Sequence, residues 1–186
     1  MQNLFHRMAC YKNASLLIGL CILMMGLVAC KKNPQLPSNR IQETSTAEDM
    51  LKLNKLLAEV ELQDIQEYLS NQKILLQKDS IGFWYAVIKE GNGNLLKKGM
   101  GIELAYSMEL LDGTICYTSK EKGKKSLVVG KNEVERGLDL ALERLTENSE
   151  SIVVVPSHLA FGALGNQNCI PPRSPVVYRI YSLKIR

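Results

Sequence analysis

The sequence has few residues of the kinds that enzymes most often use for proton transfer or metal binding. Only two histidines, His6 and His158, occur in 186 residues. His158 has no carboxylate or serine at a spacing that would make it a general base, so we interpret it as a loop residue. No glycine-rich phosphate loop, Cys-X-X-Cys pair or carboxylate pair at metal-ligand spacing occurs either. We therefore expect no cofactor and no metal site.

The charge and composition exclude several further classes of protein. Lysine and arginine exceed aspartate and glutamate by 23 − 19 = 4, an excess too small to indicate a nucleic-acid surface, so we expect no nucleic-acid partner. With 46% hydrophobic and 23% charged residues, the chain is neither collagen-like, fully disordered nor a polytopic membrane protein. Its length fits one domain with appendages.

The amino terminus has the layout of a secretory signal. Arg7 and Lys12 precede an apolar run over residues 16–28, and Leu27-Val28-Ala29 leads into Cys30. This segment resembles a bacterial lipoprotein lipobox. We predict a signal peptide over residues 1–29, cleavage before Cys30 and lipidation of its thiol, although an uncleaved anchor helix ending at a chance cysteine is the alternative. The prediction places the protein in the cell envelope, lipid-anchored to a membrane on the periplasmic or outer-membrane face.

A tether and a helix follow. Residues 30–44 contain Pro34 and Pro37 and show no hydrophobic periodicity, which indicates a lipidated tether. Ser45 and Glu48 fit a capping box, and we predict an amphipathic N-terminal helical segment over residues 45–78 whose helix ends near Ser70. One face carries the apolar residues Met50, Leu53, Leu57, Val60, Ile65 and Tyr68. Packing on the following domain is the favoured partner for this face, and a homodimer through it is the alternative.

The periodicity changes to two after residue 82, which indicates strands. The strongest example is 102–110, where five apolar residues alternate with other residue types. Leu138, Ala141, Leu142 and Leu145 instead share one face of a short helix. We predict a domain over residues 83–186 of the α+β class, with a five-to-six-stranded antiparallel curved sheet wrapped on one short helix.

Four segments in a fixed order resemble one family. They are Asp112-Gly113, Val129–Gly137, Leu159–Gly162 and Ile170-Pro171-Pro172, and residues 83–186 resemble the FKBP-type peptidyl-prolyl cis-trans isomerase domain. Together with the amino terminus, the layout is similar to gliding-motility-associated FKBP-like lipoproteins. The resemblance implies an apolar pocket between sheet and helix that takes up a prolyl side chain.

The resemblance also assigns residues to that pocket. It implies catalytic positions at Tyr106, Val134, Phe161, Ile170 and Tyr178, and substrate-binding positions at Cys116, Glu135 and Leu138. Glu135 matches the residue whose backbone N–H bonds a ligand, a role in which its side chain takes no part.

The sequence departs from the family pattern at three places. Cys116-Tyr117-Thr118 stands where the family has Phe-Asp-Ser, Leu138 where it has Trp, and Phe161 where it has Tyr. Cys116 and Cys169 both border the implied pocket, so a disulfide between them or two isolated thiols is expected.

Two functions follow as hypotheses. The first is a peptidyl-prolyl isomerase that helps extracytoplasmic proteins to fold by binding the X–Pro segments of proline-containing polypeptide clients. The alternative is a catalytically weak FKBP-like binding or assembly module of an envelope complex.

Overall fold

The computed structural model describes residues 40–186, so the predicted signal peptide, Cys30 and most of the predicted tether lie outside the described residues. Residues Asp49–Arg186 form one compact unit. No helix within the described part of the chain is long and apolar enough to cross a membrane.

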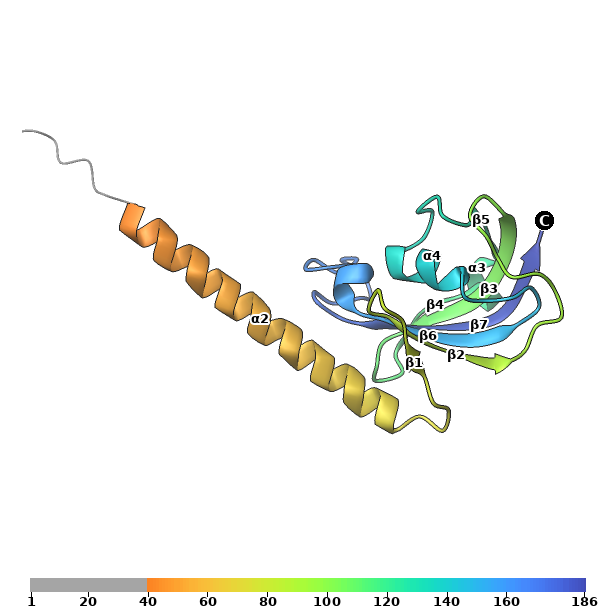
Figure 1. The fold of residues 1–186 in the computed structure, drawn as a ribbon, viewed down its shortest axis with the longest axis horizontal. Coiled ribbons are helices and arrows are strands. Elements are labelled where there is room, and N and C mark those ends of the chain that lie inside the picture. The colour runs from red at the N-terminus through yellow and green to blue at the C-terminus, as the bar shows by residue number, and fades with distance from the viewer. Residues whose placement is uncertain (1–39) are drawn as a thin grey trace, which may run out of the picture. The chain divides into compact units, whose positions relative to one another are not determined.

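The described chain consists of one long helix followed by an antiparallel sheet with short helices (Figure 1). The strands are β1 (Gln77–Lys78), β2 (Trp84–Lys89), β3 (Gly101–Glu109), β4 (Ile115–Thr118), β5 (Lys125–Val128), β6 (Glu150–Val155) and β7 (Val176–Ile185). The helices are α2 (Arg40–Ser70), α3 (Ser119–Lys122), α4 (Arg136–Leu142) and the 3₁₀ helix η1 (Ser157–Leu159). The predicted α+β class is confirmed. The sheet has seven strands instead of five or six, because the two-residue β1 is too short to show a periodicity.

The sheet is built around β3 and β7. Its order is β1-β2-β6-β7-β3-β4, and β5 also pairs with β3. The edge of β3 that faces away from β7 pairs with two strands, β5 along its first half and β4 along its second. A register shift between Ala105 and Tyr106 interrupts the pairing of β3 with β7, and such a bulge redirects the side chains that follow it.

Each face of the sheet is covered by a separate hydrophobic core. On one face, α4 packs against the strands and buries Leu138 and Leu142 with side chains of β3, β6 and β7 (Figure 1). On the other face, Ile65 of α2 packs with Trp84, Ile152 and other strand residues. Strand β6 contributes alternate residues to both cores, which explains why it is a continuous apolar run.

Helix α2 differs from its predicted bounds. It begins at Arg40 instead of at the predicted cap Ser45, so the predicted tether to residue 44 is too long. No proline or glycine lies within residues 40–44 to stop the helix from extending. The helix ends at Ser70, as predicted, but residues 71–78 form a turn and β1 instead of a continued helical segment.

Only the carboxy-terminal part of α2 packs its apolar residues into a core. Ile65 is buried, with Tyr68 and Leu69 half-buried beside it. Earlier apolar side chains of the helix stay exposed, among them Met50, Leu51, Leu53, Leu56 and Val60. The prediction that the apolar face packs on its own domain is therefore confirmed for the last two turns of the helix and wrong for Met50, Leu53 and Val60 of the preceding turns.

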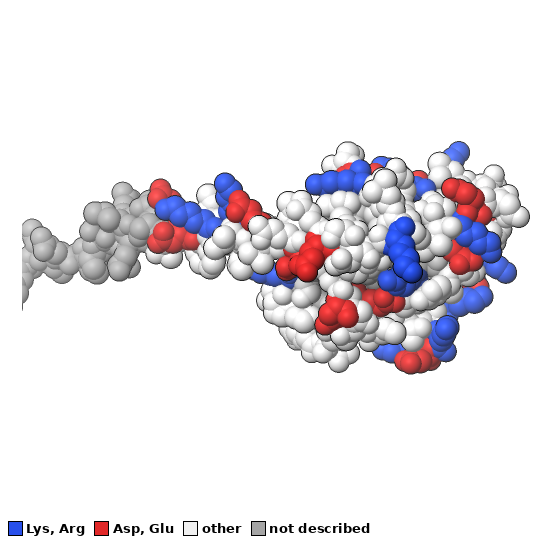
Figure 2. Space-filling view, turned by 90° about the horizontal axis from the view of Figure 1, so that it is seen from below, with Lys and Arg blue, Asp and Glu red and all other residues white. Residues whose placement is uncertain are grey.

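Charged side chains of both signs are interspersed over the face of the molecule in Figure 2. Several form ion pairs across strands and loops, such as Lys124 with Glu103 at 2.8 Å and Lys89 with Glu150 at 3.2 Å. Exposed pairs of this kind each contribute at most about 1 kcal/mol to stability, so the two cores dominate the stability of the fold.

Candidate functional site

The segment before α4 is held close to the sheet by two features. The buried carboxylate of Asp139 accepts hydrogen bonds from the backbone N–H of Gly130 at 2.8 Å and of Asn132 at 3.0 Å. Gly137 lies so close to β6 that a Cβ there would overlap Cγ1 of Val155. The lack of a side chain at Gly137 therefore lets α4 approach the strands.

The structure brings seven of the eight predicted site residues into the first core. We call this group the site cluster. It consists of Tyr106, Cys116, Val134, Leu138, Phe161, Ile170 and Tyr178. They come from β3, β4, α4, β7 and two connecting segments, one before α4 and one between η1 and β7, so distant parts of the chain contribute to one hydrophobic core. Their roles in catalysis or substrate binding remain predictions.

The cluster has a buried floor and a partly exposed edge. Tyr178 and Leu138 are 0% exposed and Tyr106 is 5% exposed, whereas Phe161 and Cys116 are half-buried. The Leu138 side chain, where the family pattern has Trp, is thus fully packed. Solvent therefore contacts the edge of the cluster and not its floor.

Three tyrosine rings form a contiguous aromatic group. The ring centre of Tyr106 lies 5.9 Å from that of Tyr178 and 4.8 Å from that of Tyr117, on which it is stacked. The Tyr117 hydroxyl donates to the carbonyl of Gly123 at 3.0 Å. In the sequence, Tyr117 was notable only because it stands where the family pattern has Asp. The structure shows that its ring is an aromatic neighbour of the cluster.

The side chain of Glu135 has a contact that the sequence did not indicate. Glu135 immediately precedes α4, and its carboxylate accepts a hydrogen bond from the Tyr178 hydroxyl at 2.9 Å. Burial, followed by the charge of Glu135, raises the pKa of Tyr178 well above its usual value. Burial and then Glu135 raise the pKa of Tyr106 as well. Both hydroxyls therefore remain protonated at neutral pH.

A disulfide joins the edge of the cluster to the loop before β7. It links Cys116 with Cys169, with a Cα–Cα distance of 5.5 Å, so the hypothesis of a bridge is confirmed over that of two isolated thiols. In the same loop, the side-chain oxygen of Asn166 accepts N–H bonds from residues 168, 169 and 170. These contacts fix the position of Ile170 relative to β4.

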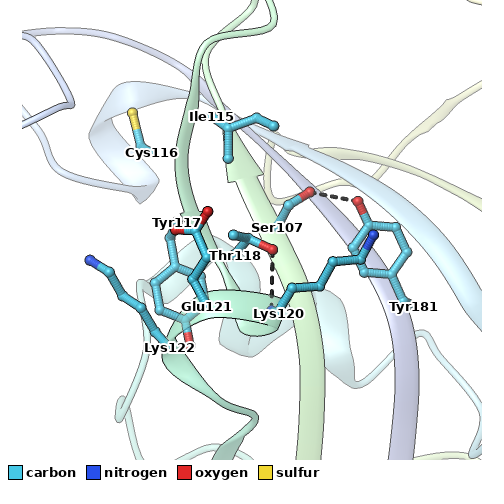
Figure 3. A pocket seen from close by; sticks show the side chains of 9 residues that line it. All are labelled: Ser107, Ile115, Cys116, Tyr117, Thr118, Lys120, Glu121, Lys122 and Tyr181. Atoms are coloured by element: carbon cyan, nitrogen blue, oxygen red, sulfur yellow. Dashed lines mark hydrogen bonds between the residues drawn. The ribbon is translucent and has the colours of Figure 1, made fainter.

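A separate hollow of about 360 Å³ lies beside β4 and α3 (Figure 3). The side chains of Ser107 and Tyr181 point toward each other across it, with their oxygens 2.9 Å apart. Of the nine residues that line it, Cys116 alone belongs to the site cluster, and its side chain extends away from the Ser107–Tyr181 pair. This hollow is therefore distinct from the predicted prolyl site.

Comparison with known proteins relates part of the chain to one family. The family model described as FKBP-type peptidyl-prolyl cis-trans isomerase matches residues 93–182. This segment holds every member of the site cluster and both cysteines of the disulfide.

Individual relatives agree with this match. The human "Peptidyl-prolyl cis-trans isomerase FKBP9" is 30% identical over 92 residues, which are 49% of this chain and 16% of that protein. "FK506-binding protein 1" of Dictyostelium discoideum is 25% identical over 101 residues, 54% of this chain and 94% of that protein. The crystal structure of FkpA from Escherichia coli superposes with a TM-score of 0.61 at 21% identity, covering 100% of this chain and 98% of that one. The last likeness concerns the fold alone.

Proposed function

We propose that the FKBP-type peptidyl-prolyl cis-trans isomerase domain formed by residues 93–182 catalyses rotation about X–Pro bonds of polypeptides at the site cluster. The observation that carries the proposal is the convergence of aromatic and aliphatic side chains from distant segments on one place between the sheet and α4. The substrates are proline-containing segments of other proteins.

The chemistry suits a site without a proton donor or a nucleophile. The barrier to rotation, about 18–20 kcal/mol, comes from amide resonance. Twisting the bond uncouples the nitrogen lone pair from the carbonyl, so the twisted amide is less dipolar than the planar one. An apolar site therefore disfavours the planar ground state more than the twisted transition state, which lowers the barrier.

The residues at the edge of the cluster provide the contacts that a prolyl segment needs. Phe161 presents a half-buried ring, and the half-buried Cys116 of the disulfide adds apolar surface to the cluster. The backbone N–H of Glu135 lies at the start of α4, where N–H groups have no partner within the helix. We propose that it donates to a carbonyl of the bound chain and so holds the chain in a turn.

A kinetic assay with a matched pair of variants tests this proposal. The full chain is expected to accelerate the isomerisation of a short X–Pro peptide. Phe161→Ala is expected to lower kcat/KM by about tenfold, as the loss of an aromatic contact with the bound peptide implies. Leu164→Ala changes an apolar side chain three residues away that is 73% exposed, and it should leave the rate unchanged. A rate equal to that in buffer alone would refute the proposal.

A second candidate, a binding or assembly module of an envelope complex, is supported by the packing of the floor. Tyr178 and Leu138 are fully buried, and Leu138 is smaller than the Trp of the family pattern. In this candidate, the site binds a prolyl segment without lowering the barrier to rotation about its X–Pro bond. Saturable binding of the peptide, measured by calorimetry, with no acceleration of its isomerisation would favour this candidate.

We further propose that the protein acts on clients outside the cytoplasm and is held on a membrane by a lipid on Cys30. The lipobox-like sequence supports this location, and so does the disulfide, because disulfides persist in oxidising compartments. Cys30→Ser should move the protein from the membrane fraction to the soluble fraction of cells. Equal membrane association of both forms would contradict the lipid anchor.

The exposed apolar residues of α2 support a homodimer as a further part of the proposal. Burying such side chains against a second copy would remove apolar surface from water. Light scattering over a concentration series should show a mass that doubles, and Leu53→Glu should reduce it to that of a monomer. A constant monomer mass of the unmodified chain at all concentrations would refute the dimer.

A further inference from the structure

Helix α2 contacts the segment that carries Phe161 through one carboxylate. Glu61 accepts two hydrogen bonds from Ser157, the first residue of η1: one from the backbone N–H at 2.5 Å and one from the hydroxyl at 2.7 Å. Ser157 is 5% exposed and Glu61 is half-buried. Hydrogen bonds to a charged acceptor are shorter and stronger than neutral ones, so this contact is a firm attachment point between residues 96 positions apart in the sequence.

A chain of backbone hydrogen bonds leads from this attachment to the site cluster. The carbonyl of Ser157 accepts from the N–H of Gly162 at 2.7 Å, which closes the turn that contains Phe161. The carbonyl of Gly162 in turn accepts from the N–H of Arg173 at 3.0 Å. Arg173 ends the Pro171–Pro172 loop that follows Ile170, so the two segments that carry Phe161 and Ile170 are joined to each other and to Glu61.

A second side chain of the same helix contacts the second of these loops. The guanidinium of Arg173 donates to the side-chain oxygen of Asn54 at 2.6 Å. Asn54 and Glu61 are seven residues apart, which is close to two full turns, so they share one face of α2. Within Asp49–Arg186, this face of the helix therefore contacts both loops at the edge of the site cluster.

We infer that Glu61 is a positioning residue for the prolyl site, holding the turn that carries Phe161 and, together with Asn54, the loop that follows Ile170. The inference rests on the proposed function of the site cluster. It assigns α2 a role in turnover although the helix lies outside residues 93–182, which match the isomerase family. Glu61 acts through Ser157 and the backbone of the turn, without touching the substrate.

Kinetics of the full chain test this inference. Glu61→Ala is expected to lower kcat/KM for an X–Pro peptide by about tenfold, because small displacements of positioning groups have large effects on rate. Glu61→Gln should recover most of it, since the amide oxygen accepts from the N–H of Ser157 and the amide nitrogen donates to its hydroxyl. Glu59→Ala removes an exposed carboxylate of the same helix and should equal the unmodified chain. Unchanged kcat/KM in Glu61→Ala would overturn the inference.

Amide hydrogen exchange gives a readout that does not depend on turnover. In Glu61→Ala, the N–H groups of Gly162 and Arg173 should exchange at least about tenfold faster, while those of β7 stay protected. Ser157→Ala, which removes only the hydroxyl contact, should also accelerate the exchange of these N–H groups, but by less. Unchanged exchange at Gly162, or equal acceleration in β7, would contradict the inference. An unmodified chain without isomerase activity would refute the proposed function, while the exchange data would still decide whether Glu61 orders the turn.

Discussion

The hydroxyl of Tyr178 donates a hydrogen bond to the carboxylate of Glu135 at 2.9 Å, joining strand β7 to the start of α4 across the floor of the site cluster. Tyr178 is fully buried, whereas Glu135 is half-buried and in reach of water. The two partners are therefore not equivalent. Loss of the carboxylate leaves the buried Tyr178 hydroxyl without an acceptor, whereas loss of the hydroxyl leaves a carboxylate that water can hydrogen-bond.

This asymmetry predicts an ordering of variants in urea unfolding. Glu135→Ala should lower the free energy of unfolding by about 1–3 kcal/mol, the cost of a buried polar group without a partner. Tyr178→Phe should cost less. Adding Tyr178→Phe to Glu135→Ala should recover part of the loss, because the unpaired hydroxyl is gone. A double variant less stable than Glu135→Ala alone would show that the hydrogen bond is not the cause.

The raised pKa values of Tyr178 and Tyr106 predict a loss of stability at alkaline pH. Above pH 10 the unfolded chain releases the tyrosine protons, while the folded chain retains them. The folded state then binds more protons than the unfolded state, so the free energy of unfolding falls with pH, by up to about 1.4 kcal/mol per pH unit for each tyrosine.

Urea unfolding between pH 9 and 11 measures this slope. Tyr178→Phe removes one of the two groups and should make the decline shallower. Parallel declines in the unmodified chain and the variant would contradict the assignment to Tyr178.

The disulfide between Cys116 and Cys169 spans 53 positions of sequence and should stabilise the fold by about 2–4 kcal/mol, mainly by restricting the unfolded chain. Reduction should lower the free energy of unfolding of the unmodified chain in urea by this amount and leave that of a Cys116→Ser, Cys169→Ser variant unaffected. Peptide mapping should recover the two cysteines in one linked peptide before reduction. Alkylation of both under denaturing, non-reducing conditions would disprove the bridge.

At Gly137, substitution by alanine should destabilise the fold, although helix propensity alone predicts that it stabilises a helix. Alanine in place of glycine within an exposed helix stabilises it by about 1 kcal/mol. At Gly137 the added Cβ would overlap Val155 and lie 3.1 Å from Cβ of Leu159, and such overpacking costs about 1–3 kcal/mol. Gly137→Ala should therefore lower the melting temperature. A higher melting temperature would mean that α4 and β6 are less tightly packed.

Local patterns predicted the regular elements well. The alternation over residues 102–110 identified β3, and Leu138, Ala141 and Leu142 identified α4. The elements that were missed, β1, α3 and η1, are two to four residues long. Segments this short show no periodicity, because contacts with the rest of the fold stabilise them. The start of α2 was misplaced because Ser45 can cap a helix but does not prevent one from starting earlier.

The site residues could be predicted only at positions that match the FKBP-type family pattern. It supplied the members of the site cluster and the positions of Cys116 and Cys169, whose spacing alone would not have paired them. The Glu135–Tyr178 and Glu61–Ser157 hydrogen bonds join residues 43 and 96 positions apart. Each depends on how a helix packs against the sheet or a loop, so no local pattern indicates it.

NMR exchange spectroscopy tests the central claim most directly, because it measures the interconversion of an X–Pro peptide and locates its binding site in the same sample. Without a catalyst, interconversion takes roughly tens to hundreds of seconds. With the full chain present, we predict exchange fast enough to give cross-peaks between the cis and trans signals. We also predict that amide shift changes centre on Glu135, Phe161 and Ile170. Exchange at the uncatalysed rate, or shift changes centred on Ser107 and Tyr181, would contradict the account.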